Sequence, residues 1–415
     1  MVLLSHPTGN ANVAEVAAAL NGEEMLAAYY TCVHWRPEAV YARMAPASVR
    51  AMFERRSRVR LPEKMVHSHP ARELIRSALL RAGRRDLVTD LVTGERRLFS
   101  IDAVYRDLDR HVARELGRYS AISAVYAYED GALAQFRAAE KRGLKRIYDL
   151  PIGYWRASRR IAEEEAERKP EWKGTLNALA DSAEKCARKD EELELADTVI
   201  APSAFVKETL EMFPGARKQI VVNPFGVPAR IAVRRALTSR AEPLRVLYVG
   251  GLTQRKGIAY LFEAAEKLGK AITLTVIGRK AGASEALDRC CERFRWIESL
   301  PHERILAEMR AHDVFVFPSL FEGLALVNGE AISQGLPVIT TRNSGGSEIL
   351  RDGVDSFLVP IRDADAIAAR LTALHEDREL LKRMSDQALE RARELTWQGY
   401  RERTVAAVRA AITAE

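Results

Sequence analysis

The stretch DVFVFPSLFEGLALVNGEAISQGLPVITT, residues 313–341, decides the fold class of this chain. It starts with an apolar run that ends at a Pro-Ser turn, continues as a helix-like segment, and closes with the β-branched run VITT. A strand, a covering helix and a second strand in this order predict a parallel sheet that is buried on both faces. Two carboxylates, Glu322 and Glu330, stand in the helical part with seven residues between them, so the stretch indicates a functional site as well as a fold.

The same alternation runs along the chain in two series. Apolar runs typical of strands occur in the first half at 2–6, 25–35, 121–130, 145–151, 197–203 and 219–224, and in the second half at 244–250, 271–278, 313–318 and 337–341. Helix-like stretches lie between them, including a long charged one at 157–193. Residues 223–243 contain Pro and Gly without a clear period, which indicates a linker. Because 415 residues are too many for one ordinary core, we predict two parallel α/β domains with a cleft between them.

The composition is that of a soluble globular protein, with 47% hydrophobic and 29% charged residues. No apolar run approaches the ~20 residues that span a bilayer, and the N-terminal MVLLSHPTGN lacks the basic region of a signal peptide. Cys32, Cys186, Cys290 and Cys291 show no CxxC spacing, so we expect free thiols rather than zinc ligands or disulfides. These features favour the cytoplasm.

The net charge of +7 is concentrated in one segment. Residues 50–97 contain 13 Lys and Arg against six Asp and Glu, which accounts for the whole excess. Such a segment suits anionic lipid headgroups, nucleic acid or a phosphorylated acceptor, and it is equally typical of a solvated basic helix face. We therefore expect association with an anionic membrane surface as one outcome, and regard nucleic-acid binding as the less favoured one.

The spacing of the two glutamates points to an extended ligand. In an open α/β sheet, ligands bind at the carboxyl ends of the strands, and FPSLFEG occupies that position. If residues 322–330 are mostly helical, the glutamates lie ~12 Å apart along the axis, too far for a shared proton or for the carboxylate pair of a retaining hydrolase. A nucleotide sugar fits this spacing, with its diphosphate facing the amides from Gly323 to Leu326. The alternative is that Glu322 caps the helix and Glu330 is a surface residue.

A second stretch, VLYVGGLTQRKGIAYLFEAAEKL, is typical of a strand, a glycine turn and a helix, with Arg255 and Lys256 in the turn. Two cations in such a turn can neutralise a leaving diphosphate without a metal. The turn matches neither a Walker A loop nor GxGxxG, which argues against kinase and dehydrogenase chemistry. A basic pair at a surface turn is common, but a basic pair together with the spaced glutamates, each at a predicted strand end, indicates a joint site.

Four motifs together resemble those of the retaining glycosyltransferases of family 4, which have the GT-B fold: ADTVIAPSAFVKETL, YVGGLTQRKG, DVFVFPSLFEGLALVNGEAISQGLPVI and GGSEILRDGVDSFLV. They stand in the family's order and cover most of residues 190–360. The resemblance implies two Rossmann-like domains, of which 1–225 binds the acceptor and 226–395 binds the nucleotide-sugar donor. It also implies a C-terminal helix at 396–415 that packs back on the N-terminal domain, and sugar transfer with retention of configuration.

The same resemblance assigns roles to individual residues. Glu322 would lie beside the transferred sugar and the reacting centre, Arg255 and Lys256 would contact the diphosphate, and Glu330 would bind the ribose. Further donor contacts would come from the backbone of Gly251, Gly323, Leu324 and Ala325. The chain departs from the family's pattern at several positions: Gly251 replaces a common arginine, Ala325 a common glycine, and Asn328 and Gly329 two apolar residues.

The N-terminal half resembles the family in architecture only. The loop HPTGNANV offers Gly9, Asn10 and Asn12 to the donor phosphate or the acceptor, since glycine permits close approach of the backbone. An ordinary turn with Asn12 as a helix N-cap is the alternative. Glu129 and Asp149 stand at predicted strand ends that face the same cleft. We assign Glu129 to the acceptor side and treat Asp149 as a candidate catalytic carboxylate, at a position where many relatives have histidine.

We expect no metal ion or other cofactor. Asp107-Leu-Asp109 and Asp363-Ala-Asp365 match the Asp-x-Asp pattern of metal-dependent glycosyltransferases, but the first lies in a charged helical stretch and the second opens a helix, where acids act as caps. The sequence therefore predicts a cytoplasmic, or peripherally membrane-bound, glycosyltransferase with a nucleotide-diphosphate-sugar donor and a glycan, lipid-linked or small-molecule acceptor. A nucleotide-sugar epimerase or hydrolase on the same fold and a catalytically silent binding module are the alternatives.

Overall fold

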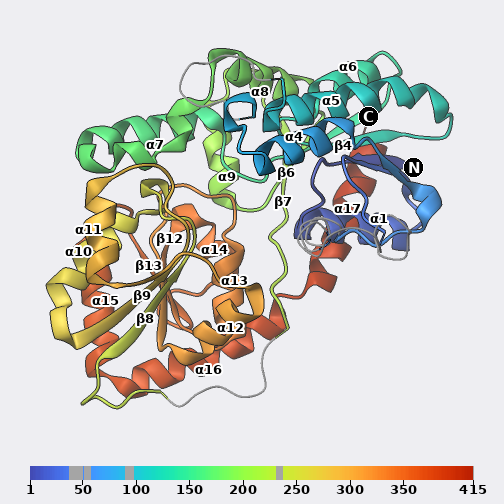
Figure 1. Cartoon of the computed structure of the whole chain (residues 1–415). Coiled ribbons are helices and arrows are strands. Elements are labelled where there is room, and N and C mark those ends of the chain that lie inside the picture. The colour runs from blue at the N-terminus through green and yellow to red at the C-terminus, as the bar shows by residue number, and fades with distance from the viewer. Residues whose placement is uncertain (37–49, 51–57, 89–97, 230–236, 415) are drawn as a thin grey trace.

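The computed structural model describes residues 1–36, 50, 58–88, 98–229 and 237–414. Two β-sheets, one in each half of the chain, organise these residues (Figure 1). The first has the strand order β3-β2-β1-β4-β5-β6-β7 and the second β10-β9-β8-β11-β12-β13, and all pairs in both are parallel. The strands are β1 Val2–Ser5, β2 Leu26–Thr31, β3 Val66–Ser68, β4 Ala124–Tyr128, β5 Lys145–Asp149, β6 Thr198–Ala201, β7 Gln219–Val222, β8 Leu244–Val249, β9 Ile272–Ile277, β10 Arg295–Ile297, β11 Val314–Phe317, β12 Val338–Thr341 and β13 Ser356–Val359.

Helices cover both faces of the N-terminal sheet. Successive strand residues point to opposite faces, so Val2 and Leu4 join one core while Leu3 joins the other. The first core is closed by α1 and α17, and the second by α5, α6 and α8. The helices of this half are α1 Ala11–Gly22, α4 Ala71–Arg81, α5 Ile101–Glu115, α6 Leu133–Glu140, α7 Trp155–Arg168, α8 Ala183–Leu195 and α9 Ala204–Thr209.

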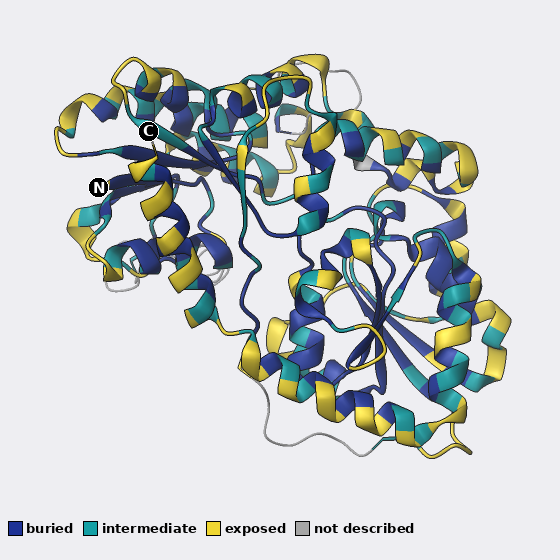
Figure 2. Ribbon diagram, turned by 180° about the vertical axis from the view of Figure 1, so that it is seen from behind, coloured by how far each residue is buried: buried dark blue, intermediate teal, exposed yellow. Residues whose placement is uncertain are grey.

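The C-terminal sheet is enclosed in the same way. Figure 1 shows α10 and α15 on one side of it and α12 and α13 on the other, and Figure 2 shows its strands buried between helices with exposed outer faces. The helices of this half are α10 Ile258–Leu268, α11 Glu285–Arg293, α12 His302–Ala311, α13 Leu326–Ser333, α14 Gly346–Ile349, α15 Ala364–Glu376, α16 Arg378–Glu394 and α17 Trp397–Thr413. Two fully covered parallel sheets confirm the predicted fold class.

The last helix, α17, crosses back to the N-terminal domain. It packs along α1, and ion pairs join Arg401 to Glu15 and Arg409 to Glu23. The predicted return of the C-terminal helix is confirmed. The described part of the predicted linker contains no helix or strand between β7 and β8, and residues 230–236 lie outside the described residues. Within the part of the chain that is described, no helix combines the length and apolar character needed to cross a bilayer.

Two expectations differ from the structure. Residues 157–193 are not one helix, because α7 ends at Arg168, just before Pro170, and short 3-10 turns at 170–175 and 177–180 separate it from α8. Strands β3, β10 and β13 were not expected. All three stand at sheet edges and have three or four residues. Strands β3 and β10 contain at most two apolar residues, too few to form a recognisable pattern.

Candidate active site

The predicted cations stand in a short 3-10 turn that joins β8 to α10. Thr253 precedes the turn, and its hydroxyl accepts a hydrogen bond from the Arg255 amide at 3.3 Å. Gly257 ends the turn in the left-handed conformation with φ of 67°, and a Cβ there would lie 2.0 Å from the carbonyl oxygen of Pro318. Since only glycine allows this approach, the turn and the loop of residues 318–325 (the FEG loop) form one packed unit.

Helix α13 begins later than the glutamate spacing assumed. Residues before Leu326 form a loop at the carboxyl end of β11, with Ala325 in an extended conformation. The helical separation of ~12 Å between Glu322 and Glu330 therefore does not apply, because three of the seven intervening residues are not helical. This corrects the expectation, although both residues keep their places on either side of the helix start.

Two of the predicted backbone donors are available in this loop. Among the described residues, the amides of Gly323 and Leu324 have no hydrogen-bond partner. The amide of Ala325 donates to the carbonyl oxygen of Ser344 at 2.9 Å, so it cannot also serve a ligand without breaking that bond. Gly251 faces open space, with no atom within 4 Å of an added Cβ.

Glu322 lies between both cations. Its Oε1 is 3.1 Å from Nη1 of Arg255 and 3.1 Å from Nζ of Lys256. The Lys256 ammonium also lies 4.9 Å from the centroid of the Phe317 ring, an attractive cation–π geometry. The structure therefore brings together the three residues that were predicted at the sugar and the diphosphate.

Phe321, the neighbour of Glu322, is inserted into the N-terminal domain. Its side chain is 1% exposed, and its ring packs edge-on against Phe205 with centroids 5.4 Å apart. Gly153 makes room for it, because a Cβ there would lie 2.4 Å from the Phe321 Cζ. The position of Glu322 therefore depends on both domains.

Gly323 extends this contact between the domains. Its carbonyl oxygen accepts a hydrogen bond from the Ser203 hydroxyl at 2.6 Å. A Cβ on Gly323 would lie 1.8 Å from the carbonyl oxygen of Pro151, so the two backbones touch directly.

Replacing Gly323 by alanine is expected to destabilise the domain contact by ~1–3 kcal/mol, because the added methyl group overlaps a backbone oxygen that cannot move freely. Thermal unfolding measures the loss. The matched control is Gly251→Ala, where the same methyl group enters open space and the melting temperature should not fall. Equal melting temperatures for the Gly323 variant and the wild type would contradict the contact.

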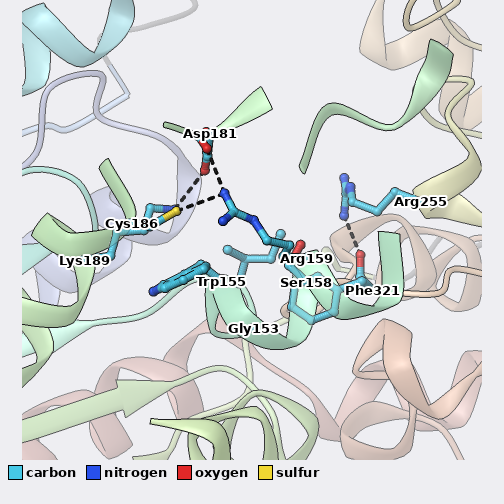
Figure 3. Close-up of a pocket in the computed structure, with 10 residues that line it drawn as sticks. Gly153, Trp155, Ser158, Arg159, Asp181, Cys186, Lys189, Arg255 and Phe321 are labelled. Atoms are coloured by element: carbon cyan, nitrogen blue, oxygen red, sulfur yellow. Dashed lines mark hydrogen bonds and ion pairs between the residues drawn. The ribbon is translucent and has the colours of Figure 1, made fainter. Parts of the chain in front are cut away.

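A cavity of about 320 Å³ opens between the domains beside this cluster (Figure 3). The C-terminal domain contributes Arg255 and Phe321 to its wall, and the N-terminal half contributes Ile152, Gly153, Trp155, Ser158, Arg159, Asp181, Cys186 and Lys189. Sequence reasoning did not single out Arg159 or Lys189 as site residues, since neither belongs to a recognisable motif. The local signals were Gly153, a glycine just after a predicted strand end, and Trp155, an aromatic residue near the same strand end that could stack on a sugar.

The polar groups of the cavity wall are tied to one another. Arg159 donates to the Asp181 carbonyl oxygen at 2.8 Å and to the Cys186 sulfur at 3.4 Å. Lys189 lies 3.4 Å from Glu129. Figure 3 shows the Arg159 guanidinium between Asp181 and Cys186, on the N-terminal side of the cavity opposite Arg255. The wall thus offers cationic and hydrogen-bonding groups that are already held in place.

Glu129 stands behind Lys189 rather than in the cavity wall. Its side chain is 8% exposed, and burial raises its pKa to about 7 against the opposing effect of the Lys189 ammonium. Lys189 therefore connects Glu129 to the cavity wall, and the assignment of Glu129 to the acceptor stays a prediction.

Glu330 lies on α13, apart from the cavity wall. Its Oε1 is 3.8 Å from Nε2 of His302 on α12, and burial raises the pKa of its carboxyl while His302 and Arg58 lower it. The unusual residues before it serve packing. Asn328 is buried and donates to the Ser344 hydroxyl at 3.2 Å, and Gly329 leaves room for Val227, whose Cγ1 would lie 2.5 Å from an added Cβ.

The loop after β1 is held by hydrogen bonds among its own residues and to the start of α1. Gly9 has φ of 58°, and its amide donates to Nδ1 of His6 at 3.0 Å. Asn10 caps α1 by accepting from the Val13 amide at 3.1 Å, so the N-cap is Asn10 and not Asn12, which corrects the alternative considered for this loop. Asn12 is buried, and its Nδ2 has no hydrogen-bond partner among the described residues. Contact of this loop with donor or acceptor stays a prediction.

Asp149 turns its carboxyl away from the cavity wall. It is 2% exposed and accepts a hydrogen bond from the Tyr126 hydroxyl at 2.6 Å. The hydroxyls of Tyr128 and Tyr400 share this enclosure, and burial raises the pKa of Asp149 to about 7. Its backbone continues to Pro151, which touches the FEG loop. The geometry favours a structural role for this carboxyl over the predicted catalytic one.

The two Asp-x-Asp patterns supply helix caps. Asp109 accepts from the amides of Ala134 and Gln135 at the start of α6, and Asp363 accepts from the Ala366 amide at the start of α15. In the described ranges, no three His, Cys, Asp or Glu side chains form a group that could hold a metal ion. The independence from metals stays a prediction.

Comparison with known proteins places the C-terminal half in a sequence family. Residues 230–391 match the family model described as "Glycosyl transferases group 1". The chain is 31% identical over 205 residues to sucrose synthase of Acidithiobacillus caldus, covering 42% of this chain and 26% of that protein. It is 32% identical over 152 residues to the amylovoran biosynthesis glycosyltransferase AmsK of Erwinia amylovora, covering 32% of this chain and 37% of that protein. The chain thus spans well under half of these two relatives' own lengths.

Solved structures match over the whole chain. Sucrose-phosphate synthase of Thermosynechococcus elongatus has a TM-score of 0.70 at 17% identity, covering 100% of this chain and 99% of that one. HepE of Anabaena, solved in complex with UDP, has a TM-score of 0.62 at 14% identity, covering 99% of both chains. At such low identity these matches show the fold alone, and they confirm the two-domain GT-B architecture.

Proposed function

We propose that this chain, whose residues 230–391 form a glycosyl transferases group 1 domain on a GT-B fold, transfers a sugar from a nucleoside-diphosphate-sugar donor to an acceptor. One observation carries the proposal: Arg255, Lys256 and Glu322 meet in one cluster, and Arg255 also lines the cavity between the domains. A diphosphate bound at the 253–257 turn would face two cations and the free amides of Gly323 and Leu324. The structural relative HepE, which was solved with UDP, supports a nucleotide donor.

The leaving diphosphate defines the task of the two cations. As the bond between sugar and diphosphate breaks, further negative charge grows on the diphosphate oxygen, and fixed positive groups stabilise the more highly charged transition state more than the ground state. Arg255 and Lys256 supply this charge, which supports metal-independent transfer. Activity that survives EDTA treatment is the expected result, and activity that returns only with a divalent cation would refute metal independence.

Retention of configuration is the finer part of the proposal. Glu322 is held by two cations and a packed loop beside the reacting centre, and we assign it to binding the transferred sugar rather than to nucleophilic attack. Departure and attack would then occur on the same face of the sugar, with the diphosphate oxygen assisting deprotonation of the acceptor. Proton NMR of the product gives the anomeric configuration, and a trapped covalent glycosyl-enzyme on a carboxylate would refute the same-face mechanism.

The acceptor would occupy the cavity of the N-terminal half. Ser158, Arg159 and Lys189 present hydrogen-bond donors on the part of the cavity wall that the N-terminal half contributes, which suits a hydroxylated glycan or lipid-linked acceptor. The polysaccharide-biosynthesis enzyme AmsK among the relatives supports such an acceptor. Glu330, on α13, is assigned to the donor ribose.

A thermal-shift panel of UDP-, GDP- and ADP-sugars tests the function. A donor should raise the melting temperature of the wild type, and it should be consumed with an added acceptor to give a glycosylated product. If the donor alone is hydrolysed or epimerised, the chain is an enzyme of that kind instead. If no nucleotide sugar shifts the melting temperature, a silent binding module replaces the proposal.

We further propose that the N-terminal domain associates with anionic membrane surfaces. In the described part of the basic segment, α4 exposes Leu74 and Ile75 by 43% and 45%. The exposed arginines stand at the end of this helix and just after it, at positions 81, 84 and 85, whereas Arg72 and Arg76 are half-buried and paired with Asp107 and Glu73. Leu98 and Ile101, next to α4, are also exposed. Residues 51–57 and 89–97 of the predicted basic segment lie outside the described residues. An exposed apolar and basic surface of this kind suits the interface of an anionic bilayer.

Liposome flotation tests this surface. The chain is expected to float with vesicles that contain phosphatidylserine and not with pure phosphatidylcholine vesicles, and the double variant Leu74→Ser/Ile75→Ser should float less. Equal flotation with both vesicle types would contradict an electrostatic contribution. No flotation with either vesicle type would refute the proposed membrane association.

A further inference from the structure

Helix α7 belongs to the N-terminal half by sequence but lies across the C-terminal domain. Figure 1 shows it above α10 and α11. Its first turn follows Gly153, which contacts Phe321 of the FEG loop, and its 14 residues span ~21 Å. The helix and the turn after it, residues 155–175, are called the α7 arm here. The arm reaches from the sugar end of the proposed donor site to the 253–257 turn, where the diphosphate is proposed to bind.

The far end of α7 places a fully buried carboxylate in the C-terminal domain. Glu165 is 0% exposed. Its Oε1 accepts hydrogen bonds from Gln254 Nε2 at 2.7 Å and from the Tyr260 hydroxyl at 2.7 Å, and its Oε2 accepts from Arg362 Nε at 2.8 Å. All three donors come from the C-terminal domain, so one N-terminal residue joins three of its elements.

Gln254 links this contact to the turn that contains Arg255 and Lys256. It is fully buried and directly precedes Arg255. Its side-chain Oε1 accepts a hydrogen bond from the Ala259 backbone amide at 3.1 Å, and its backbone amide donates to the Thr175 hydroxyl at 2.9 Å. The turn is therefore held on its inner side by the α7 arm, while Arg255 faces the cavity.

Thr175 provides a second grip on the same turn. Its carbonyl oxygen accepts from the Thr253 hydroxyl at 2.5 Å, and Thr253 in turn caps the Arg255 amide. The arm is also fitted to the neighbouring loop, since a Cβ on Gly174 would lie 2.1 Å from the Ala283 carbonyl oxygen. Hydrogen bonds on both residues before Arg255 leave the turn little freedom to shift.

Arg362 shows that this arrangement carries a conformational cost. It has φ of 65°, a left-handed conformation that is unfavourable for a non-glycine residue. Its guanidinium reaches Glu164 at 2.8 Å as well as Glu165. A buried ion pair is often no more stabilising than a well-packed apolar pair. The stability of the fold alone therefore does not explain the charged pair of Glu165 and Arg362. A role in positioning the turn does explain it.

We infer that Glu165 is a positioning residue for the donor diphosphate: through Gln254 it orients the turn that carries Arg255 and Lys256, and so couples this turn to the α7 arm of the N-terminal domain. This inference rests on the proposed function. It extends the active site to a carboxylate that touches neither substrate nor the reacting atoms. Small displacements of such supporting groups can weaken a site strongly, because the geometry of the binding groups is lost.

Titration of the full-length protein with inorganic pyrophosphate tests the inference. Pyrophosphate serves as the probe because it presents the two phosphoryl groups without a base or sugar. In Glu165→Gln, an amide NH2 replaces one acceptor and faces the existing donors, so pyrophosphate should bind about tenfold more weakly. Glu163→Gln, an exposed glutamate on the same helix, makes the same change of charge and should bind like the wild type.

A second variant separates positioning from folding. Gln254→Met removes the same link from the other side at nearly constant volume, and it should weaken pyrophosphate binding by a similar factor. The double variant should show little further loss, since both changes break one connection. Melting temperatures are recorded for each variant, and a purely structural role would lower them without changing the affinity for pyrophosphate.

The outcomes distinguish the inference from the function on which it rests. If Glu165→Gln binds pyrophosphate like the wild type, or if the two losses simply add, the inference is wrong while the proposed function stands. If the wild type itself binds neither pyrophosphate nor a nucleotide sugar, the proposed function fails first. With a donor from the panel, Glu165→Gln should also raise KM for the donor and leave KM for the acceptor unchanged.

Discussion

Lys256→Met is expected to lower the rate of sugar transfer by about 100- to 1000-fold, the effect of removing one preorganised group that stabilises transition-state charge. The Lys256 ammonium lies 3.1 Å from Glu322 and is partly buried. Methionine keeps the length of the aliphatic stem against the Phe317 ring and removes only the charge. The loss should appear mainly in kcat, because charge on the diphosphate grows as the bond to the sugar breaks.

Steady-state kinetics with the donor found in the panel measures this effect. Lys267→Met is the matched control, since Lys267 lies near the end of α10 and pairs with Asp365 at the surface, and its kcat should stay close to that of the wild type. A Lys256 variant with nearly full kcat would remove this residue from the proposed chemistry. Both variants should keep the wild-type melting temperature within a few degrees.

Asp149→Asn is expected to make the stability of the protein less dependent on pH. Burial raises the pKa of Asp149 from 3.8 to about 7 in the folded state. The folded protein therefore holds a proton that the unfolded chain has released between these values, and stability falls as the pH rises from about 4 to 7. A pKa difference of this size corresponds to ~4 kcal/mol.

The difference in stability between variant and wild type isolates this carboxyl. Urea unfolding at a series of pH values should show nearly equal stability at pH 4 and an advantage of ~4 kcal/mol for Asp149→Asn at pH 8. The raised pKa values of Glu129 and Glu192 act in both proteins and cancel in the difference. A difference that does not change with pH would contradict the buried position of the carboxyl. If the carboxyl is structural, the variant should keep its activity at pH 6, whereas a catalytic carboxyl would make the variant inactive.

Much of the fold could be predicted from local patterns. Alternating strands and helices predict parallel sheets because each helix must cover an apolar strand face. Ten of the strands follow from apolar runs, whereas β13 was missed and the short edge strands β3 and β10 have too few apolar residues to be recognised. The meeting of Arg255, Lys256 and Glu322 was also predictable, since each follows a strand and the carboxyl ends of parallel strands share one edge of the sheet.

Residue environments were less predictable where they depend on the opposite domain. Asp149 stands at a strand end, yet its carboxyl turns toward Tyr126 and Tyr400, and Tyr400 comes from the last helix of the chain. Glu322 was expected on a helix but lies in a loop. Its neighbour Phe321 anchors this loop by packing against Phe205 of the N-terminal domain. No periodic pattern reports such contacts, because they join residues far apart in the sequence.

The sequence by itself determined the two parallel α/β domains, the linker between their sheets, and the strand-end positions of the glutamates and the basic pair. These features depend on residue order within single repeats, where the periods of helix and strand operate. Only the tertiary structure decided that α7 crosses to the C-terminal domain and that Glu165 reaches Gln254, a residue 89 positions away. The role of a buried carboxylate depends on the hydrogen-bond donors around it, and the donors around Glu165 reach it only when the two domains pack against each other.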